Sequence, residues 1–105
     1  MKKKIVLKEL KALLMKDYPG IIDKVILFGS QVNGKSKSYS DYDILVVLST
    51  KHNWKLDDKI IDTCYRIDLK YNILTDIKIA SKDELKSSFG KQPFIQQAIK
   101  YGIAA

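Results

Sequence analysis

The sequence predicts an α/β fold in which helices cover a small β-sheet, and three observations support this prediction. Short apolar runs of strand length alternate along the chain with segments whose apolar residues recur at helical spacing. Glycine and proline interrupt the pattern between these segments. The 105 residues, of which 46% are hydrophobic and 30% charged, suffice for one modest core, so we expect a single domain over residues 1–105.

One helix and two strands are predicted in the first half of the chain. The helix covers residues 4–17, because four leucines recur at helical spacing before Pro19 and Gly20 end the pattern: Leu7, Leu10, Leu13 and Leu14. Residues 23–28 are a short apolar run that ends at Gly29, which is typical of a strand buried on both faces. Residues 41–48 form the second predicted strand, and residues 49–56 a turn or loop.

The second half of the chain predicts further helices and a third strand. Apolar residues at helical spacing favour a helix over residues 57–70, and residues 73–79 indicate a strand that contains Asp76. Ser81 and Glu84 have the spacing of a capping box, which predicts that a short helix begins there. A last helix near residues 94–101 is expected to end at Gly102.

Composition and charge exclude several kinds of protein. The net charge of +7 favours polyanionic partners, such as nucleotides, nucleic acid or an acidic protein surface, without choosing among them. The single cysteine, Cys64, cannot form an internal disulfide, and with the single histidine, His52, it cannot complete a zinc site of the usual kind. No run of 18 apolar residues is present to span a bilayer. We therefore expect a cytoplasmic protein that does not cross a membrane.

Two carboxylates, Asp41 and Asp43, stand one residue apart at the start of the second predicted strand. Because strand side chains alternate between faces, both project to the same side. Carboxylates this close repel each other unless a cation lies between them, and hard oxygen ligands suit Mg²⁺. The pair therefore indicates a magnesium site, and the alternative is a turn residue followed by a cap.

Gly29 and Ser30 directly follow the first buried strand. A glycine there lets the backbone approach a ligand, and free N–H groups at the start of a following helix, together with the serine hydroxyl, can bind phosphate. The letters of residues 29–36 also match the P-loop pattern G-x-x-x-x-G-K-[ST]. A P-loop needs a helix that begins at its Lys-Ser, whereas here a strand follows within five residues, so the P-loop interpretation is set aside.

The stretch of residues 29–34, with residues 40–47 after it, resembles the signature of the minimal nucleotidyltransferases of the polymerase-β-like superfamily. The resemblance is sharpest over residues 25–48, and the chain length and the order of elements are similar as well. It implies a small mixed β-sheet flanked by helices. It also implies that Gly29 and Ser30 bind the triphosphate of a nucleotide, with ATP expected, and that Asp41 and Asp43 are metal ligands.

A third carboxylate of this family lies on a neighbouring strand, and Asp76 is the best-placed candidate here. If it faces Asp41 and Asp43, it can bind the metal and take the proton from an attacking hydroxyl group. The alternative is an edge-strand residue that faces water. Asp68, on the preceding predicted helix, is the second candidate for the third carboxylate.

The resemblance implies transfer of a nucleoside monophosphate from a triphosphate to an acceptor hydroxyl group, and AMP is the expected nucleoside monophosphate. Two Mg²⁺ ions held by Asp41, Asp43 and Asp76 would assist an in-line displacement. Small members of the family resemble antitoxins that pair with HEPN-domain toxins, so a HEPN-type protein is implied as partner. The rival interpretation is a binding module of the same fold that acts without turnover. Direct binding of nucleic acid rests on the charge alone and stays open.

Overall fold

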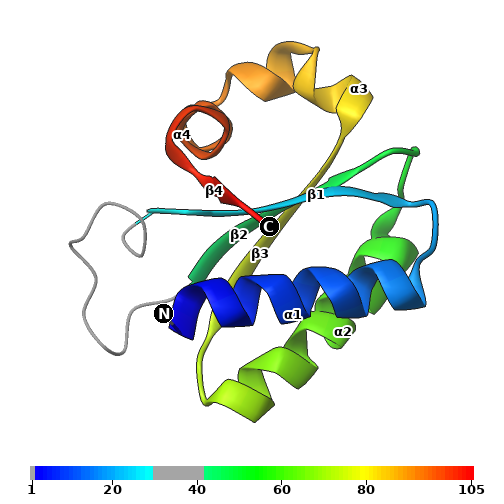
Figure 1. Ribbon diagram of the computed structural model, residues 1–105. Helices are drawn as coiled ribbons and strands as arrows, with labels where there is room; N and C mark the ends of the chain where they lie inside the picture. The colour runs from blue at the N-terminus through cyan, green and yellow to red at the C-terminus, as the bar shows by residue number, and fades with distance from the viewer. Residues whose placement is uncertain (1, 30–41) are drawn as a thin grey trace.

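The computed structural model describes residues 2–29 and 42–105, and it contains a four-stranded sheet between two groups of helices (Figure 1). Two predicted site residues, Ser30 and Asp41, lie outside the described residues. The elements follow one another in the order α1 (Lys2–Asp17), β1 (Ile22–Phe28), β2 (Tyr42–Leu48), α2 (Trp54–Tyr71), β3 (Thr75–Ser81), α3 (Lys82–Leu85), η2 (Ser88–Lys91), α4 (Pro93–Tyr101) and β4 (Ile103–Ala104).

The sheet is mixed, with the strand order β3-β2-β1-β4. β1 pairs antiparallel with β2 and with β4, whereas β2 and β3 are parallel and are joined by the long helix α2. The predicted small mixed sheet with flanking helices is therefore confirmed. The two-residue strand β4 was not predicted, because two residues are too few to show an alternating pattern.

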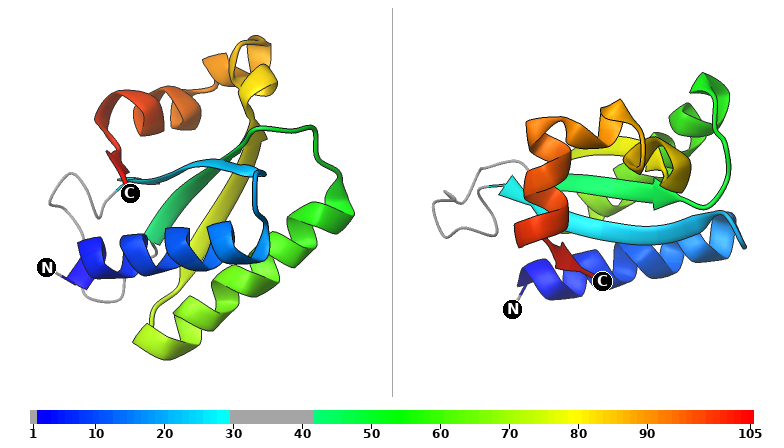
Figure 2. Two further views of the ribbon diagram at one scale, coloured as in Figure 1. Left: turned by 45° about the vertical axis from the view of Figure 1, so that its right-hand side comes forward. Right: turned by 90° about the horizontal axis from the view of Figure 1, so that it is seen from above.

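Helices α1 and α2 cover one face of the sheet, and α3, η2 and α4 cover the other (Figure 2). Alternate residues of each strand supply the two cores, as a sheet covered on both faces requires. The larger core lies under α1 and α2 and includes the strand residues Ile22, Val25, Leu27, Ile44, Val46 and Leu48. The smaller core lies under α4 and includes Ile26, Phe28, Leu45, Val47 and Ala80.

Local capping signals set several of the helix ends. The predicted capping box is present: the Glu84 N–H donates to the Ser81 hydroxyl oxygen (3.1 Å), and the Ser81 N–H donates to the Glu84 carboxylate (2.9 Å). Helix α2 begins at Trp54, three residues before its predicted start, because the Asn53 side chain caps it by accepting the Leu56 N–H (3.0 Å). The prediction of a loop over residues 49–56 was therefore wrong for its last three residues.

Gly102 follows the end of α4 as predicted, but for a different reason from the usual one. Its φ of −71° is open to any residue, so the left-handed conformation is not what requires glycine here. A Cβ at this position would instead collide with the Ala98 carbonyl oxygen and the Ile26 side chain. Glycine is needed because α4 turns back against β1 at this point.

No helix of residues 2–29 and 42–105 combines the length and the apolarity that a membrane span requires.

Candidate functional site

The end of β1 and the starts of β2 and β3 meet at one end of the sheet. This follows from the topology, because β1 runs antiparallel to β2, while β3 runs parallel to it. Phe28 is the register partner of Asp43, and Asp43 in turn is the register partner of Asp76. Since neighbouring strands lie about 4.8 Å apart, the two aspartates are adjacent.

Both aspartates face the side of the sheet that α4 covers. Within β2, Ile44 packs in the core under α1 and α2, whereas Leu45 packs in the core under α4. The alternation of strand side chains places Asp43 on the same face as Leu45. Because residues matched in register across parallel strands point to the same face, Asp76 lies on that face beside it. The structure thus brings two of the three predicted carboxylates together, while Asp41 lies outside the described residues.

Gly29 lies directly against this pair of carboxylates. Its φ of +77° is in the left-handed region, which residues with a Cβ rarely adopt. A Cβ at this position would also collide with the carboxylate of Asp43. The glycine therefore allows both the turn at the end of β1 and the placement of the Asp43 side chain.

Asp76 is partly exposed and has a nearby cation. The Lys78 ammonium lies 3.4 Å from the Asp76 carboxylate, and each side chain is 45% exposed. An ion pair this exposed contributes little free energy, so another cation can replace Lys78 at small cost. The Asp43 side chain is less exposed, since the residue is half-buried and packs beside Gly29.

The donor chemistry of this cluster suits a hard divalent cation. Carboxylate oxygens are the ligands that Mg²⁺ prefers, and Asp43 and Asp76 supply them from neighbouring strands. Within the part of the chain that the structure describes, no group of three acidic, histidine or cysteine side chains could hold a metal. Asp41, the third predicted carboxylate, lies outside the described residues.

Asp68 has a different role from the one considered for it as the second candidate. Its carboxylate accepts hydrogen bonds from the Thr75 hydroxyl group (2.7 Å) and from the Thr75 N–H (3.3 Å). These bonds join the end of α2 to the first residue of β3. Asp68 thus fixes the start of β3, one residue before Asp76.

His52 makes contacts that the sequence did not reveal. Its Nδ1 lies 2.6 Å from the Asp57 carboxylate, and its Nε2 lies 2.5 Å from the Glu84 carboxylate. Burial of the imidazole lowers its pKa, but hydrogen bonds to Glu84 and Asp57 outweigh burial, so the pKa of His52 is raised. For Glu84, burial raises the pKa, and the Ser81 N–H and His52 together lower it further than burial raises it.

Cys64, the single cysteine of the chain, is fully buried in α2. Burial, with a smaller effect of the Asp68 charge, raises the pKa of its thiol to about 12. A thiol with so high a pKa is not a nucleophile at neutral pH. Cys64 is therefore a packing residue of the larger core.

Comparison with known proteins agrees with this geometry. The family model for polymerase beta nucleotidyltransferases matches residues 8–104. A candidate protein adenylyltransferase of Methanocaldococcus jannaschii is 37% identical over 82 residues, which are 78% of this chain and 77% of that protein. The match to the family model includes nearly the whole chain, so it extends well beyond the segment around Gly29 and Asp43.

Solved structures share the fold at lower identity. A toxin–antitoxin structure with AMP-PNP has a TM-score of 0.63 and 20% identity, and the similarity covers 92% of this chain and 69% of that one. A complex of a tri-AMPylated Shewanella oneidensis HEPN toxin with an MNT antitoxin has a TM-score of 0.57 and 18% identity, over 96% and 69% of the two chains. With the family model and the relative at 37% identity, these results show that the chain belongs to the polymerase beta nucleotidyltransferase family.

Proposed function

We propose that this protein transfers an adenylyl group from ATP to a hydroxyl group of a partner protein. The observation that carries the proposal is the pairing of Asp43 with Asp76 on neighbouring strands, directly against Gly29. The relatives from Methanocaldococcus jannaschii, which are named as candidate protein adenylyltransferases, support the choice of reaction. The AMPylated toxin in a similar complex supports the choice of a protein acceptor.

The proposed site assigns a role to each residue. Asp41, Asp43 and Asp76 would hold two Mg²⁺ ions, while Gly29 and Ser30 would bind the triphosphate through backbone N–H groups and the serine hydroxyl. The bound ions would supply neutralisation of the charge that develops on the phosphate oxygens. Gly29 leaves room for the Asp43 carboxylate, and Asp68 holds the start of β3 so that Asp76 lies beside Asp43.

The transfer itself is an in-line displacement at the α-phosphorus of ATP. The acceptor oxygen forms a bond to this phosphorus while the bond from phosphorus to the bridging oxygen breaks, and pyrophosphate leaves. The Asp76 carboxylate takes the proton of the acceptor hydroxyl group and later releases it to water. Its partial exposure gives an acceptor access to the carboxylate from outside the protein.

The outer face of α2 offers a binding surface for the partner. Four large apolar side chains lie along it with exposed fractions between 42% and 69%, and they form the α2 stripe: Trp54, Ile61, Tyr65 and Leu69. At 100° per residue these side chains fall within one narrow arc of the helix. Exposed apolar patches of this kind commonly mark protein interfaces.

The charges along the α2 stripe favour a partner other than a second copy. Asp58 and Asp62 are exposed in the same arc. Two copies paired through this stripe would bring these acidic residues together, which is unfavourable. A helical protein of the HEPN type that presents apolar side chains beside lysine or arginine fits the stripe better, and HEPN toxins are the partners in a similar complex.

Transfer of label from ATP marked at the α-phosphate tests the proposed reaction. HEPN-domain proteins, beginning with the Shewanella oneidensis toxin, serve as acceptors in the presence of Mg²⁺. We expect the acceptor to be labelled and pyrophosphate to be released, and Asp43→Asn to abolish both. Asp83→Asn, which neutralises an exposed acid on α3, is the matched control and should leave both unchanged.

Two negative results have different meanings. Absence of label transfer, despite Mg²⁺-dependent ATP binding and a stable complex with the HEPN protein, would show that the protein is a binding module of this fold and not an enzyme. Absence of ATP binding as well would refute the proposed nucleotide site.

A further inference from the structure

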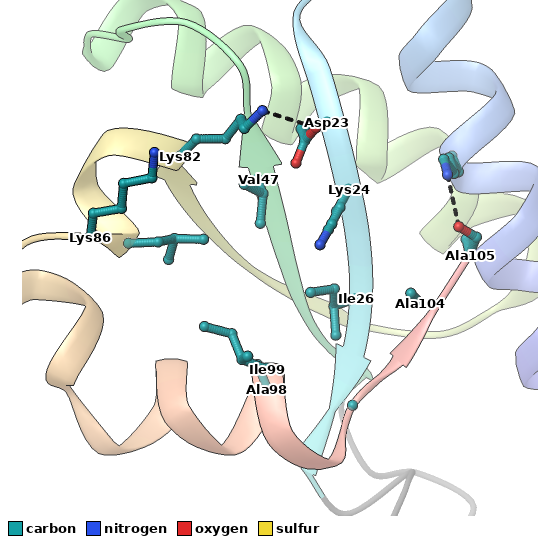
Figure 3. Close-up of a pocket in the computed structure, with 13 residues that line it drawn as sticks. Asp23, Lys24, Ile26, Val47, Lys82, Lys86, Ala98, Ile99, Ala104 and Ala105 are labelled. Atoms are coloured by element: carbon teal, nitrogen blue, oxygen red, sulfur yellow. Dashed lines mark hydrogen bonds and ion pairs between the residues drawn. The ribbon is translucent and has the colours of Figure 1, made fainter.

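A cavity lies on the face of the sheet that α4 covers, away from Asp43 and Asp76. Its volume is about 560 Å³, within the range of roughly 300–1,000 Å³ that is usual for small-molecule sites. Figure 3 shows it between β1, the end of β2, the short helix α3 and the last turn of α4. Strand β4 closes one side.

The floor of this cavity is apolar. Ile26 and Val47 come from the sheet, and Ala98 comes from α4, and all three are buried. Ile99 lies on the wall of the cavity and is 52% exposed. Ile99 therefore supplies exposed apolar surface to the cavity, whereas Ile26, Val47 and Ala98 form its closely packed floor.

The rim of the cavity is basic. Four lysines line it, namely Lys11 of α1, Lys24 of β1, Lys82 of α3 and Lys86, which directly follows α3. The acidic residue of the lining, Asp23, is 3.9 Å from the Lys82 ammonium, and Lys11 donates to the Ala105 carbonyl oxygen (2.7 Å). Neither Lys24 nor Lys86 pairs with an acidic group of the described residues. Figure 3 shows the Lys24 side chain directed from β1 toward the middle of the cavity.

The cavity is separate from the proposed nucleotide site. Val47 is four residues beyond Asp43 on β2, so about 13 Å of strand lies between them. Helix α4 packs over this interval: Phe94 contacts Phe28 with 6.4 Å between ring centroids, and Ile95 is fully buried. A molecule in the cavity would therefore not touch Asp43 or Asp76.

From the apolar floor and the basic rim, we infer that this cavity binds a small organic anion with an apolar body, such as an aliphatic or aromatic carboxylate. The body would lie against Ile99 on the floor formed by Ile26 and Val47, and the anionic group would lie between the Lys24 and Lys86 ammonium groups. An inorganic anion lacks the apolar body, and an organic cation would meet the four lysines. The inference is independent of the proposed reaction, because it involves neither ATP nor a metal.

Binding can be tested by NMR titration of the full chain with octanoate, followed by the backbone amide signals. Octylammonium, which has the same tail and the opposite charge, and inorganic phosphate, which has no tail, are the comparison ligands. We expect octanoate to shift the signals of Lys24, Ile26 and Ile99 with saturation, and the other two ligands to cause no saturable shift there. The titration needs no turnover, so its failure is distinguishable from failure of the adenylyl transfer.

Variants locate the bound anion. Lys24→Gln and Lys86→Gln should each weaken octanoate binding about three- to fivefold, as expected for exposed charge pairs. Ile99→Asp puts a negative charge at an exposed position of the wall and should abolish binding without unfolding the chain. Lys59→Gln, on the opposite side of the molecule, is the matched control and should change nothing. Equal shifts with octylammonium, no saturable shift with octanoate, or binding that survives Ile99→Asp would overturn the inference.

Discussion

Replacement of Gly29 by alanine tests whether this glycine supports the Asp43 carboxylate. The methyl group would force an L-residue into φ near +77°, which costs about 1–2 kcal/mol. Alanine also reduces the conformational freedom of the unfolded chain, which offsets about 0.4–1 kcal/mol of this cost. The expected net loss of folding free energy is therefore about 1 kcal/mol. For a domain of this size the thermal midpoint should fall by about 5 °C.

Gly20 provides the matched control, because the two glycines differ in one respect. Its φ is +78°, nearly that of Gly29, but a Cβ added at Gly20 would meet no atom within 4 Å. Gly20→Ala should therefore lose the same stability of about 1 kcal/mol, for the same backbone reason. The collision with the Asp43 carboxylate belongs to Gly29→Ala alone.

The difference between the two variants should appear in nucleotide binding. We expect Gly29→Ala to weaken Mg²⁺-dependent binding of a non-hydrolysable ATP analogue about 10–100-fold, the usual effect of disturbing the support of a metal ligand. Gly20→Ala should bind as the unmodified protein does. Isothermal titration calorimetry with Mg²⁺, and again with a chelator, measures both. Equal affinities for the two variants would refute the reasoning.

Three further predictions concern the other parts of the structure. Asp76→Asn should slow label transfer about 100-fold or more while the fold and the stability stay unchanged, because a proton acceptor is lost; an unchanged rate in single-turnover assays would exclude the assigned role. Tyr65→Asp combined with Leu69→Asp should leave the thermal midpoint within a few degrees, since both side chains are exposed, but should prevent co-elution with the HEPN partner. His52→Gln should destabilise the protein more at pH 5.5 than at pH 8.5. The pKa of His52 is raised above its ordinary 6.5, so its stabilisation is complete below that value and lost at higher pH, whereas that of Glu84, whose pKa is lowered, is retained above 4.5; thermal melts that show an equal effect at both pH values would contradict this assignment.

Local chemistry explains which parts of the fold the sequence could predict. The capping box of Ser81 and Glu84 needs only residues three positions apart, so it can be predicted from the sequence alone. The same holds for Gly29, because a glycine that ends a buried strand marks a special backbone position. Asp76 could be named as a candidate because a charge interrupts an apolar run. These features depend on neighbours in the chain, and the structure places Asp76 beside Asp43.

Features that depend on distant residues could not be predicted in the same way. The two carboxylates that bind His52 come from different elements, and Glu84 is 32 positions away in the chain. The reason for Gly102 is likewise remote, since it lies in the contact with Ile26 of β1. In each case the sequence shows a residue with known properties, while the partner that gives the residue its role is set by the packing of the elements.

The position of the candidate site itself depends on the C-terminal segment, although no predicted site residue lies there. Gly29 and its neighbour Phe28 can only adjoin Asp43 if the end of β1 is held in place. Phe94 of α4 contacts Phe28 on one face, and β4 pairs with β1 at Ile26 and Leu27. Four of the five predicted site residues, Gly29, Ser30, Asp41 and Asp43, come from one short segment. The contacts that hold the end of β1 come from residues more than 60 positions later. This separation explains why a short motif can suggest candidate site residues but not the packing that holds them in place.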